Sequence, residues 1–361
     1  MLKTTKKLQT PTVQNFLSLW EQRYKADLSS SNLTNPPSYS LLIATSSFEG
    51  RSLTATKMKD KFLSVNCQMA WIQTKNLYSY IPNILDLQEA RRITQFSFRI
   101  YRKLLEIYQN QSHKTEILSQ SKLDVSLVEL ITPDIEDLAY SLEPILLVFQ
   151  EQHVASKDWR SLGFMTTQLN FCNQLILKKL QPQERILLAP YLKFVEEQVS
   201  MPWQRVCANA ARYKMSSPRI HIVEHIFSHA SELAEKVYQR LVSLLPNYYS
   251  RRGNLSDAPI RYSCIRDLNM FQAYLCLCLL EDSLKSIEIE LLPLCAMVVE
   301  GVDIKWEVTK TWCKVLAEEL ENSIDAEYID LLIHFTQGMK NLFFRERRRL
   351  GYTEDRIVQV R

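Results

Sequence analysis

Apolar residues recur at spacings of three and four along most of this chain, which is the pattern of amphipathic helices. In the segment 13–28, for example, Phe16, Leu17, Trp20 and Tyr24 follow this spacing. The chain has only 6 glycines among its 361 residues, too few for the many turns of an all-β fold. The sequence therefore predicts an all-α protein, and its length suggests two domains.

The helical pattern is most regular from residue 157 onward. Ser217 and Pro218 form an N-cap and first-turn pair that marks a helix start. Pro190 and Pro293 fall inside two predicted helices, where proline should kink or split them. The predicted helices cover residues 162–180, 183–199, 203–215, 218–245, 262–280, 284–299, 304–320 and 326–345. We therefore predict one helical domain at 157–346, followed by a basic tail at 347–361.

The N-terminal part, residues 1–156, is predicted to be a separate and mainly helical domain. Its segment 29–56 is rich in Ser, Thr and Asn and contains Pro36-Pro37, so we expect a loop with one short strand at 39–44. The polar segment 109–122 is expected to be a connection. The helical pattern resumes near Met58 and is strongest at 85–108, and two more helices are predicted at 123–131 and 133–152.

The composition excludes several classes of protein. The chain is 46% hydrophobic and 23% charged with a net charge of +4, as in ordinary soluble proteins. Its 8 cysteines are scattered, so we expect reduced thiols and a cytoplasmic protein. No signal peptide is recognised, and no apolar run reaches the ~18 residues of a membrane span. The sequence shows no basic face with stacking aromatic residues, so we do not expect nucleic-acid binding.

Arginines gather near the end of the last predicted helix. Positive charge suits the C-terminal end of a helix, so they indicate either a solvated helix end or a docking patch for an acidic partner. These residues are Arg345, Arg347, Arg348 and Arg349.

His221, Glu224 and His225 form the pattern H-x-x-E-H, which one class of zinc peptidases uses. On a helix these three side chains share one stripe, so they permit a metal-dependent hydrolase as an alternative function. However, the apolar residues of this helix centre away from that stripe, and a zinc site needs a further ligand. We therefore assign no metal ligand. The chain has no glycine-rich phosphate loop and no Gly-x-Ser-x-Gly elbow, so we assign no catalytic residue and expect a non-enzymatic protein.

A thiol, a guanidinium and a carboxylate occur together at Cys264, Arg266 and Asp267, near the start of a predicted helix. The segment Arg252-Gly253-Asn254 precedes them and predicts a turn. Cys264 and Asp267 lie within ~60° of each other on an ideal helix. In one interpretation this set holds a pigment. In the other, Cys264 packs inward as an inert thiol and Arg266 forms a surface ion pair.

This segment resembles the phycobiliproteins, the pigment-carrying subunits of the cyanobacterial phycobilisome. Their hallmark is a Gly-Gly-Asn turn, a ten-residue step and then Cys-Leu-Arg-Asp, which here reads Arg252-Gly253-Asn254 followed by Cys264-Ile265-Arg266-Asp267. Leu280-Glu281-Asp282 stands where the family has Ala-Gly-Asp, and Leu180-Gln181-Pro182-Gln183-Glu184 is similar to its Leu-Ser-Pro-x-Glu segment. The resemblance covers about the last half of the chain and implies a globin-like C-terminal domain.

The resemblance also implies a pigment site. Cys264 would form a thioether to a linear tetrapyrrole (bilin), Asp267 would accept hydrogen bonds from pyrrole N–H groups, and Arg266 would pair with a propionate. Asn254 would belong to the same site through its turn. The residues Arg252, Tyr262 and Glu281 depart from the family pattern.

The implied partners are phycobilisome subunits or another helical protein, in a homo- or hetero-oligomer. The implied role is light harvesting, light sensing or phycobilisome assembly, with at most a peripheral place at the thylakoid membrane. Residues 1–156 match nothing in the family. A second hypothesis is therefore an unpigmented interaction module on the same scaffold.

Overall fold

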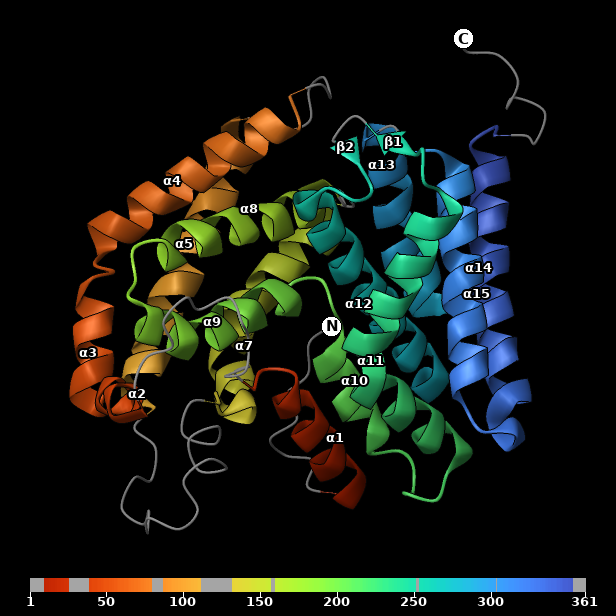
Figure 1. The fold of residues 1–361 in the computed structure, drawn as a ribbon, viewed down its shortest axis with the longest axis horizontal. Helices are drawn as coiled ribbons and strands as arrows, with labels where there is room; N and C mark the ends of the chain where they lie inside the picture. The colour runs from red at the N-terminus through yellow and green to blue at the C-terminus, as the bar shows by residue number, and fades with distance from the viewer. Residues whose placement is uncertain are drawn as a thin grey trace. The chain divides into compact units, whose positions relative to one another are not determined.

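The computed structural model describes residues 10–25, 39–79, 87–111, 132–156, 160–250, 253–302 and 304–352. These residues are almost entirely helical, as the apolar spacing predicts, and they include one two-stranded hairpin (Figure 1). The internal packing divides the chain into two units. The N-terminal unit takes in residues 17–200, and the C-terminal unit takes in residues 10–16 and those from 201 onward.

The N-terminal unit is a group of packed helices. It contains the second half of α1 (Pro11–Gln22), then α2 (Tyr39–Ser46), α3 (Phe48–Thr56), α4 (Asp60–Leu77), α5 (Leu87–Asn110), α7 (Ile135–Ser156), α8 (Arg160–Leu177) and α9 (Pro182–Gln198). Helix α4 packs against α5 and α8, and α9 packs against α8.

The contact between α4 and α8 shows why these sequences form helices. Leu63, Cys67, Ala70 and Thr74 are buried at spacings of three and four, so they form one face of α4. Cys172 of α8 faces this surface, and its Sγ lies 3.8 Å from the Sγ of Cys67. Both thiols are fully buried. They therefore act as small core residues.

The structure differs from the prediction between residues 29 and 56. Helices α2 and α3 occupy residues 39–56 where a loop and a strand at 39–44 are predicted, and residues 29–38 lie outside the described part. A short apolar run such as Leu41-Leu42-Ile43-Ala44 does not distinguish a strand from a buried helix, because both bury such a run. Ser47 begins α3 as an N-cap, and its hydroxyl accepts a hydrogen bond from the Gly50 amide at 3.1 Å.

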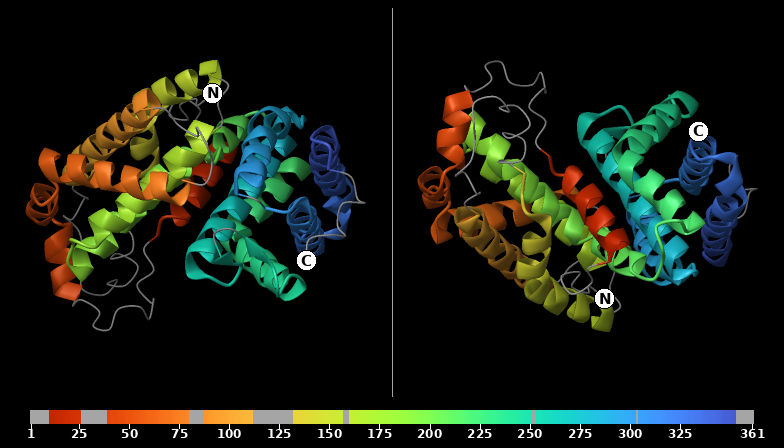
Figure 2. Two further views of the ribbon diagram at one scale, coloured as in Figure 1. Left: turned by 90° about the horizontal axis from the view of Figure 1, so that it is seen from above. Right: turned by 90° about the horizontal axis from the view of Figure 1, so that it is seen from below.

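The C-terminal unit is built from helices that nearly coincide with the predicted ones. It contains α10 (Trp203–Ala210), α11 (Pro218–Leu244), β1 (Tyr249–Ser250), β2 (Gly253–Asn254), α12 (Ala258–Glu281), the π-helix η1 (Ile287–Leu291), α13 (Leu292–Val302), α14 (Trp306–Ser323), the 3-10 turn η2 (Ala326–Tyr328) and α15 (Ile329–Arg349). Helices α14 and α15 run side by side (Figure 2). Phe16 of α1 stacks on Phe227 of α11, with ring centroids 5.8 Å apart.

Helix α12 lies at the centre of this unit. Every residue from Leu268 to Leu280 is buried, and α12 packs against α10, α11, η1 and α15. A helix that is buried on all sides reads as a continuous apolar segment rather than an amphipathic one. Within this buried segment Gln272 donates a hydrogen bond to the carbonyl oxygen of Ala230 on α11 at 2.9 Å, and further polar contacts of α12 lie toward its two ends.

The two prolines predicted to disturb helices behave differently. Pro293 lies at the start of α13, directly after the π-helix, so the helix changes type there. Pro190 lies inside α9, which continues through it.

The packing units also divide the chain at a different place from the predicted domains. Helices α8 and α9 lie in the N-terminal unit, so the division falls after residue 200 rather than after 156. The sequence pattern does not show which helices pack together, and the domain boundary at 157 stays a prediction.

Candidate functional site

A tight turn leads into the first turn of α12. Ser250 and Gly253 pair across the β1–β2 hairpin, and Gly253 has a φ of +130°. A Cβ at Gly253 would lie 2.2 Å from Oδ2 of Asp257. The backbone conformation therefore favours glycine at this position, and a larger residue would also displace the Asp257 carboxylate.

Asn254 holds this turn through local hydrogen bonds. Its backbone N–H donates to Oδ2 of Asp257 at 2.9 Å, and its side-chain Oδ1 accepts from the backbone N–H of Ser256 at 2.9 Å. Asp257 is the residue before α12, so these bonds set where the helix begins. The Asn side chain mimics a backbone turn in this arrangement. Asn254 thus supports the approach to α12.

Cys264 lies in the second turn of α12 and is only 9% exposed. Burial, and then the nearby Cys264, raise the pKa of Tyr238 on α11. The Tyr238 hydroxyl donates to the carbonyl oxygen of Leu255 at 2.9 Å. Cys264 is therefore a buried thiol of α12 within electrostatic range of Tyr238 on α11.

Arg266 and Asp267 contact each other. Nη2 and Nε of Arg266 donate to Oδ1 of Asp267 at 2.8 and 3.0 Å, and both side chains are partly exposed. Burial, followed by the charge of Asp267, raises the pKa of the Cys295 thiol on α13. Asp267 is therefore close enough to the Cys295 thiol for its charge to be felt there.

The chemistry of this set fits a bilin. A thiol can form a thioether, a carboxylate can accept hydrogen bonds from N–H groups, and a guanidinium can pair with a propionate. Cys264, Arg266 and Asp267 occur on adjacent turns of one helix, and Asn254 supports that helix from the preceding turn.

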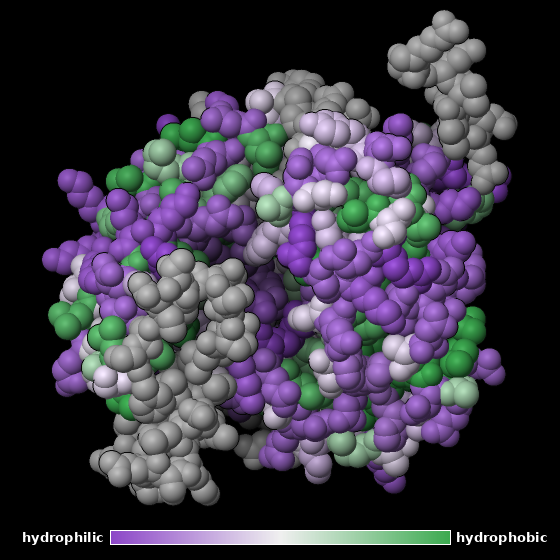
Figure 3. All heavy atoms as spheres, viewed as in Figure 1, coloured by the Kyte–Doolittle hydropathy of each residue, from purple (hydrophilic) through white to green (hydrophobic). Residues whose placement is uncertain are grey.

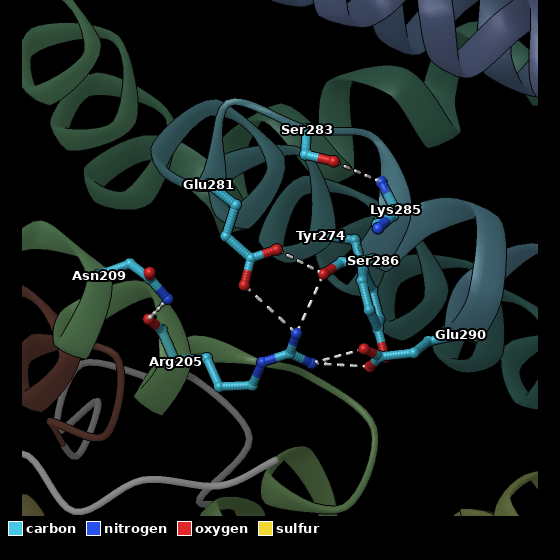
Figure 4. Close-up of polar contacts among 8 residues, drawn as sticks. All are labelled: Arg205, Asn209, Tyr274, Glu281, Ser283, Lys285, Ser286 and Glu290. Atoms are coloured by element: carbon cyan, nitrogen blue, oxygen red, sulfur yellow. Dashed lines mark hydrogen bonds and ion pairs between the residues drawn. The ribbon is translucent and has the colours of Figure 1, made fainter.

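Sequence reasoning missed a second polar cluster, at the other end of α12 (Figure 4). Nη1 of Arg205, on α10, donates to both carboxylate oxygens of Glu290 at 2.9 and 2.7 Å. Nη2 donates to Oγ of Ser286 at 3.0 Å and lies 3.5 Å from Oε1 of Glu281. The Tyr274 hydroxyl also donates to Glu290, at 3.1 Å. We call these five residues the Arg205 cluster.

The charges of the Arg205 cluster support one another. Burial is the largest single influence and opposes the charged guanidinium, but the charge and hydrogen bond of Glu290, together with Tyr274 and Glu281, raise the pKa of Arg205 overall. Burial and then the charge of Glu290 raise the pKa of Tyr274 well above its ordinary value. The cluster joins α10 to the end of α12 and to the π-helix. The only sequence signal for it is Glu281, which stands where the family pattern has glycine.

The histidines of the H-x-x-E-H pattern make other contacts. The ring of His221 stacks on Tyr328 with centroids 5.5 Å apart, and Glu224 accepts a hydrogen bond from Asn15 at 3.0 Å. Burial, and then the charge of His229, lower the pKa of His225. In the described residues, no group of three His, Cys, Asp or Glu side chains is arranged to hold a metal ion. The zinc hydrolase alternative therefore gains no support from the geometry.

The arginines of the C-terminal helix are largely engaged within the molecule. Arg347 is buried and pairs with Glu307 at 2.8 Å, Arg345 pairs with Glu288 at 2.6 Å, and Arg349 pairs with Glu346. Arg348 lies over the ring of Phe344. These contacts favour the interpretation as a charged helix end rather than a docking patch.

None of the helices in the described ranges is long and apolar enough to cross a membrane. No curated protein and no solved structure gives a significant match to the chain.

Residues 206–333 match the family model described as phycobilisome protein. The match begins just after the start of the C-terminal unit and includes α11, the turn, α12 and α14. It therefore covers Asn254, Cys264, Arg266 and Asp267. The all-α fold of these residues agrees with the globin-like fold that the resemblance implies. The C-terminal part of the chain is thus phycobiliprotein-like, and the match over residues 206–333 confirms its predicted similarity to the phycobilisome protein family.

Proposed function

We propose that this protein associates with the phycobilisome and carries a bilin attached to Cys264. The observation that supports the proposal is the grouping of a thiol, a guanidinium and a carboxylate on adjacent turns of α12, inside the segment that matches the family model. The role is non-enzymatic and lies in light harvesting, light sensing or phycobilisome assembly. In this proposal the protein acts in the cytoplasm, at the thylakoid surface.

Each residue has a distinct part in this proposal. A bound bilin supplies a conjugated system that absorbs visible light. Cys264 anchors it, Asp267 accepts hydrogen bonds from its N–H groups, and Arg266 pairs with a propionate. The contact between Arg266 and Asp267 is partly exposed, so solvent screens it and a ligand can replace it at little cost.

The proposal is tested with full-length protein purified from a host that makes bilins and their attachment enzymes. Wild-type protein should show zinc-enhanced fluorescence in a denaturing gel, and Cys264→Ala should lose it. Cys295→Ala is the matched control, because this thiol also lies in the C-terminal unit and close to Asp267. Asp267→Asn should keep the pigment but change its absorption spectrum. Colourless wild-type protein, or pigment that persists in Cys264→Ala, contradicts covalent attachment at this residue.

An unpigmented interaction module is the second candidate function. Two observations favour it: Cys264 is buried, and Arg266 pairs with Asp267. The thiol and the two charged side chains therefore have surroundings that suit them without a ligand. In this case, colourless protein would still sediment with phycobilisomes. Cys264→Ala would leave that association unchanged, whereas a pigment-dependent association would be lost.

A further inference from the structure

Helix α4 of the N-terminal unit presents an apolar stripe on its outer side. Val65, Met69 and Ile72 are spaced by four and three residues, and they are 49%, 44% and 49% exposed. Apolar side chains are visible among hydrophilic ones on the surface over α4 (Figure 3). The opposite side of α4 is buried against α8, so the stripe belongs to a helix that is already fixed in its unit. We call Val65, Met69 and Ile72 the α4 stripe.

Lysines border the α4 stripe on one side. On an ideal helix Lys61 and Lys75 lie about 40° and 80° from Val65, both in the same direction. Both are exposed, and neither forms an ion pair with another described residue. The other border carries the neutral side chain of Gln73. The outer face of α4 is therefore apolar at its centre and basic along one edge.

We propose that this face binds an acidic amphipathic helix of a partner protein. The stripe extends over ~10 Å, two turns of helix, and two helices pack well when side chains at this spacing interdigitate. Asp or Glu residues beside the partner's apolar side chains would meet Lys61 and Lys75, and such complementary charges select the partner. The proposal is independent of any pigment at Cys264, because it concerns the other unit.

Two other occupants fit this face less well. A second copy of the chain would bring the same lysines to both sides of a symmetric contact, where they repel. A lipid surface suits helices with a wide apolar face containing bulky residues, whereas α4 uses its larger apolar face against α8 and exposes only a narrow stripe.

The test uses two designed helical peptides of about 14 residues, both with leucines at the spacing of the α4 stripe. One peptide has glutamates beside the leucines and the other has lysines. Fluorescence anisotropy with the full-length chain should show at least ~10-fold tighter binding of the acidic peptide, weakening at higher salt. Val65→Glu and Met69→Glu should each weaken this binding by ~10-fold or more. Lys61→Glu combined with Lys75→Glu should reverse the preference.

The controls are matched in exposure. Val148 of α7 is 51% exposed, so Val148→Glu adds the same charge elsewhere in the same unit and should leave peptide binding unchanged. Lys178→Glu combined with Lys179→Glu makes the same change of charge at two other exposed lysines of this unit, and it should leave the preference for the acidic peptide unchanged. Circular dichroism checks that each variant is folded.

Three results would overturn the proposal. The first is equal binding of both peptides, or acidic-peptide binding that survives Val65→Glu and Met69→Glu. The second is binding to phosphatidylcholine vesicles containing phosphatidylglycerol that Val65→Glu abolishes, which assigns the face to lipid. The third is a dimer in sedimentation velocity that Val65→Glu dissociates, which assigns it to a second copy.

Discussion

The two ends of helix α12 hold their charges in different ways. At the start, Arg266 pairs with Asp267, the next residue in the chain, and both remain partly exposed. At the end, Glu281 lies in the Arg205 cluster, whose other members come from α10, α12 and the segment around η1. A local pair constrains one turn of a helix, whereas a cluster between elements fixes how those elements pack. We therefore expect the end of α12 to carry more stability, and the start to carry the proposed ligand chemistry.

Of the changes considered, removing Arg205 should lower the free energy of unfolding the most. Arg205→Ala leaves the carboxylates of Glu281 and Glu290 partly buried without the guanidinium between them. Breaking a buried ion pair costs ~3–5 kcal/mol, and the partial exposure of these groups reduces the expected loss to about 2–3 kcal/mol of unfolding free energy. Hydrogen exchange of the α12 amides measures this loss within the C-terminal unit.

Arg261→Ala is the matched control for this measurement. Arg261 is near the start of α12 and pairs with Glu235 of α11 at 2.6 Å, with both side chains exposed. Its removal should cost less than about 1 kcal/mol. Equal losses in the two variants would remove the distinction between the ends of α12.

The turn before α12 should show the next largest effect. Gly253→Ala places a Cβ 2.2 Å from Oδ2 of Asp257 at a residue with a φ of +130°. Backbone strain of this kind costs ~1–3 kcal/mol, and the displaced Asp257 also loses its bond to the Asn254 amide. We expect a loss of about 2 kcal/mol. Urea unfolding measures this loss. Gly351→Ala is the control, because Gly351 also has a positive φ but an added Cβ there would have no atom within 4 Å. The difference between the two variants separates crowding from backbone strain. A smaller loss at Gly253 than at Gly351 would contradict this account.

The fold was predictable where local chemistry decides it. Ser217 and Pro218 mark the start of α11 as predicted, because proline at the first helical position is set by its own fixed φ. The Ser217 side chain makes no capping hydrogen bond. The order in which helices pack was not predictable, since α8 and α9 carry the same apolar pattern whichever unit they join. Residues 39–44 show the same limit, because their apolar run suits a strand and a buried helix equally.

The candidate site shows this contrast at the level of side chains. Asn254, Cys264, Arg266 and Asp267 were found because they stand at fixed short spacings in the sequence. The Arg205 cluster was missed because Arg205 and Glu290 are 85 residues apart. The one signal for it in the sequence is Glu281 at the end of α12, where the family pattern has glycine.

Arg266→Ala should have little effect on stability. It removes a partly exposed pair between neighbours in sequence, and such pairs contribute less than ~1 kcal/mol. A small loss in thermal unfolding, together with a loss of bilin attachment or a shifted absorption spectrum, would assign Arg266 to ligand binding. A loss as large as that of Arg205→Ala would instead make it a structural residue like those at the other end of α12.

The smallest expected effect is the pH dependence that Glu235 contributes at the start of α12. Its hydrogen bond from Arg261 lowers the pKa of Glu235 in the folded protein. The stabilisation is therefore present above the unfolded pKa of ~4.3 and is lost as the pH falls through the folded pKa. Because solvent screens this exposed pair, we expect less than about 0.5 kcal/mol. The unfolding free energies of wild type and Glu235→Gln should differ at neutral pH and converge in acid. A difference that persists in acid would mean that Glu235 acts through packing rather than charge, and the start of α12 would then be held more firmly than its local pairs suggest.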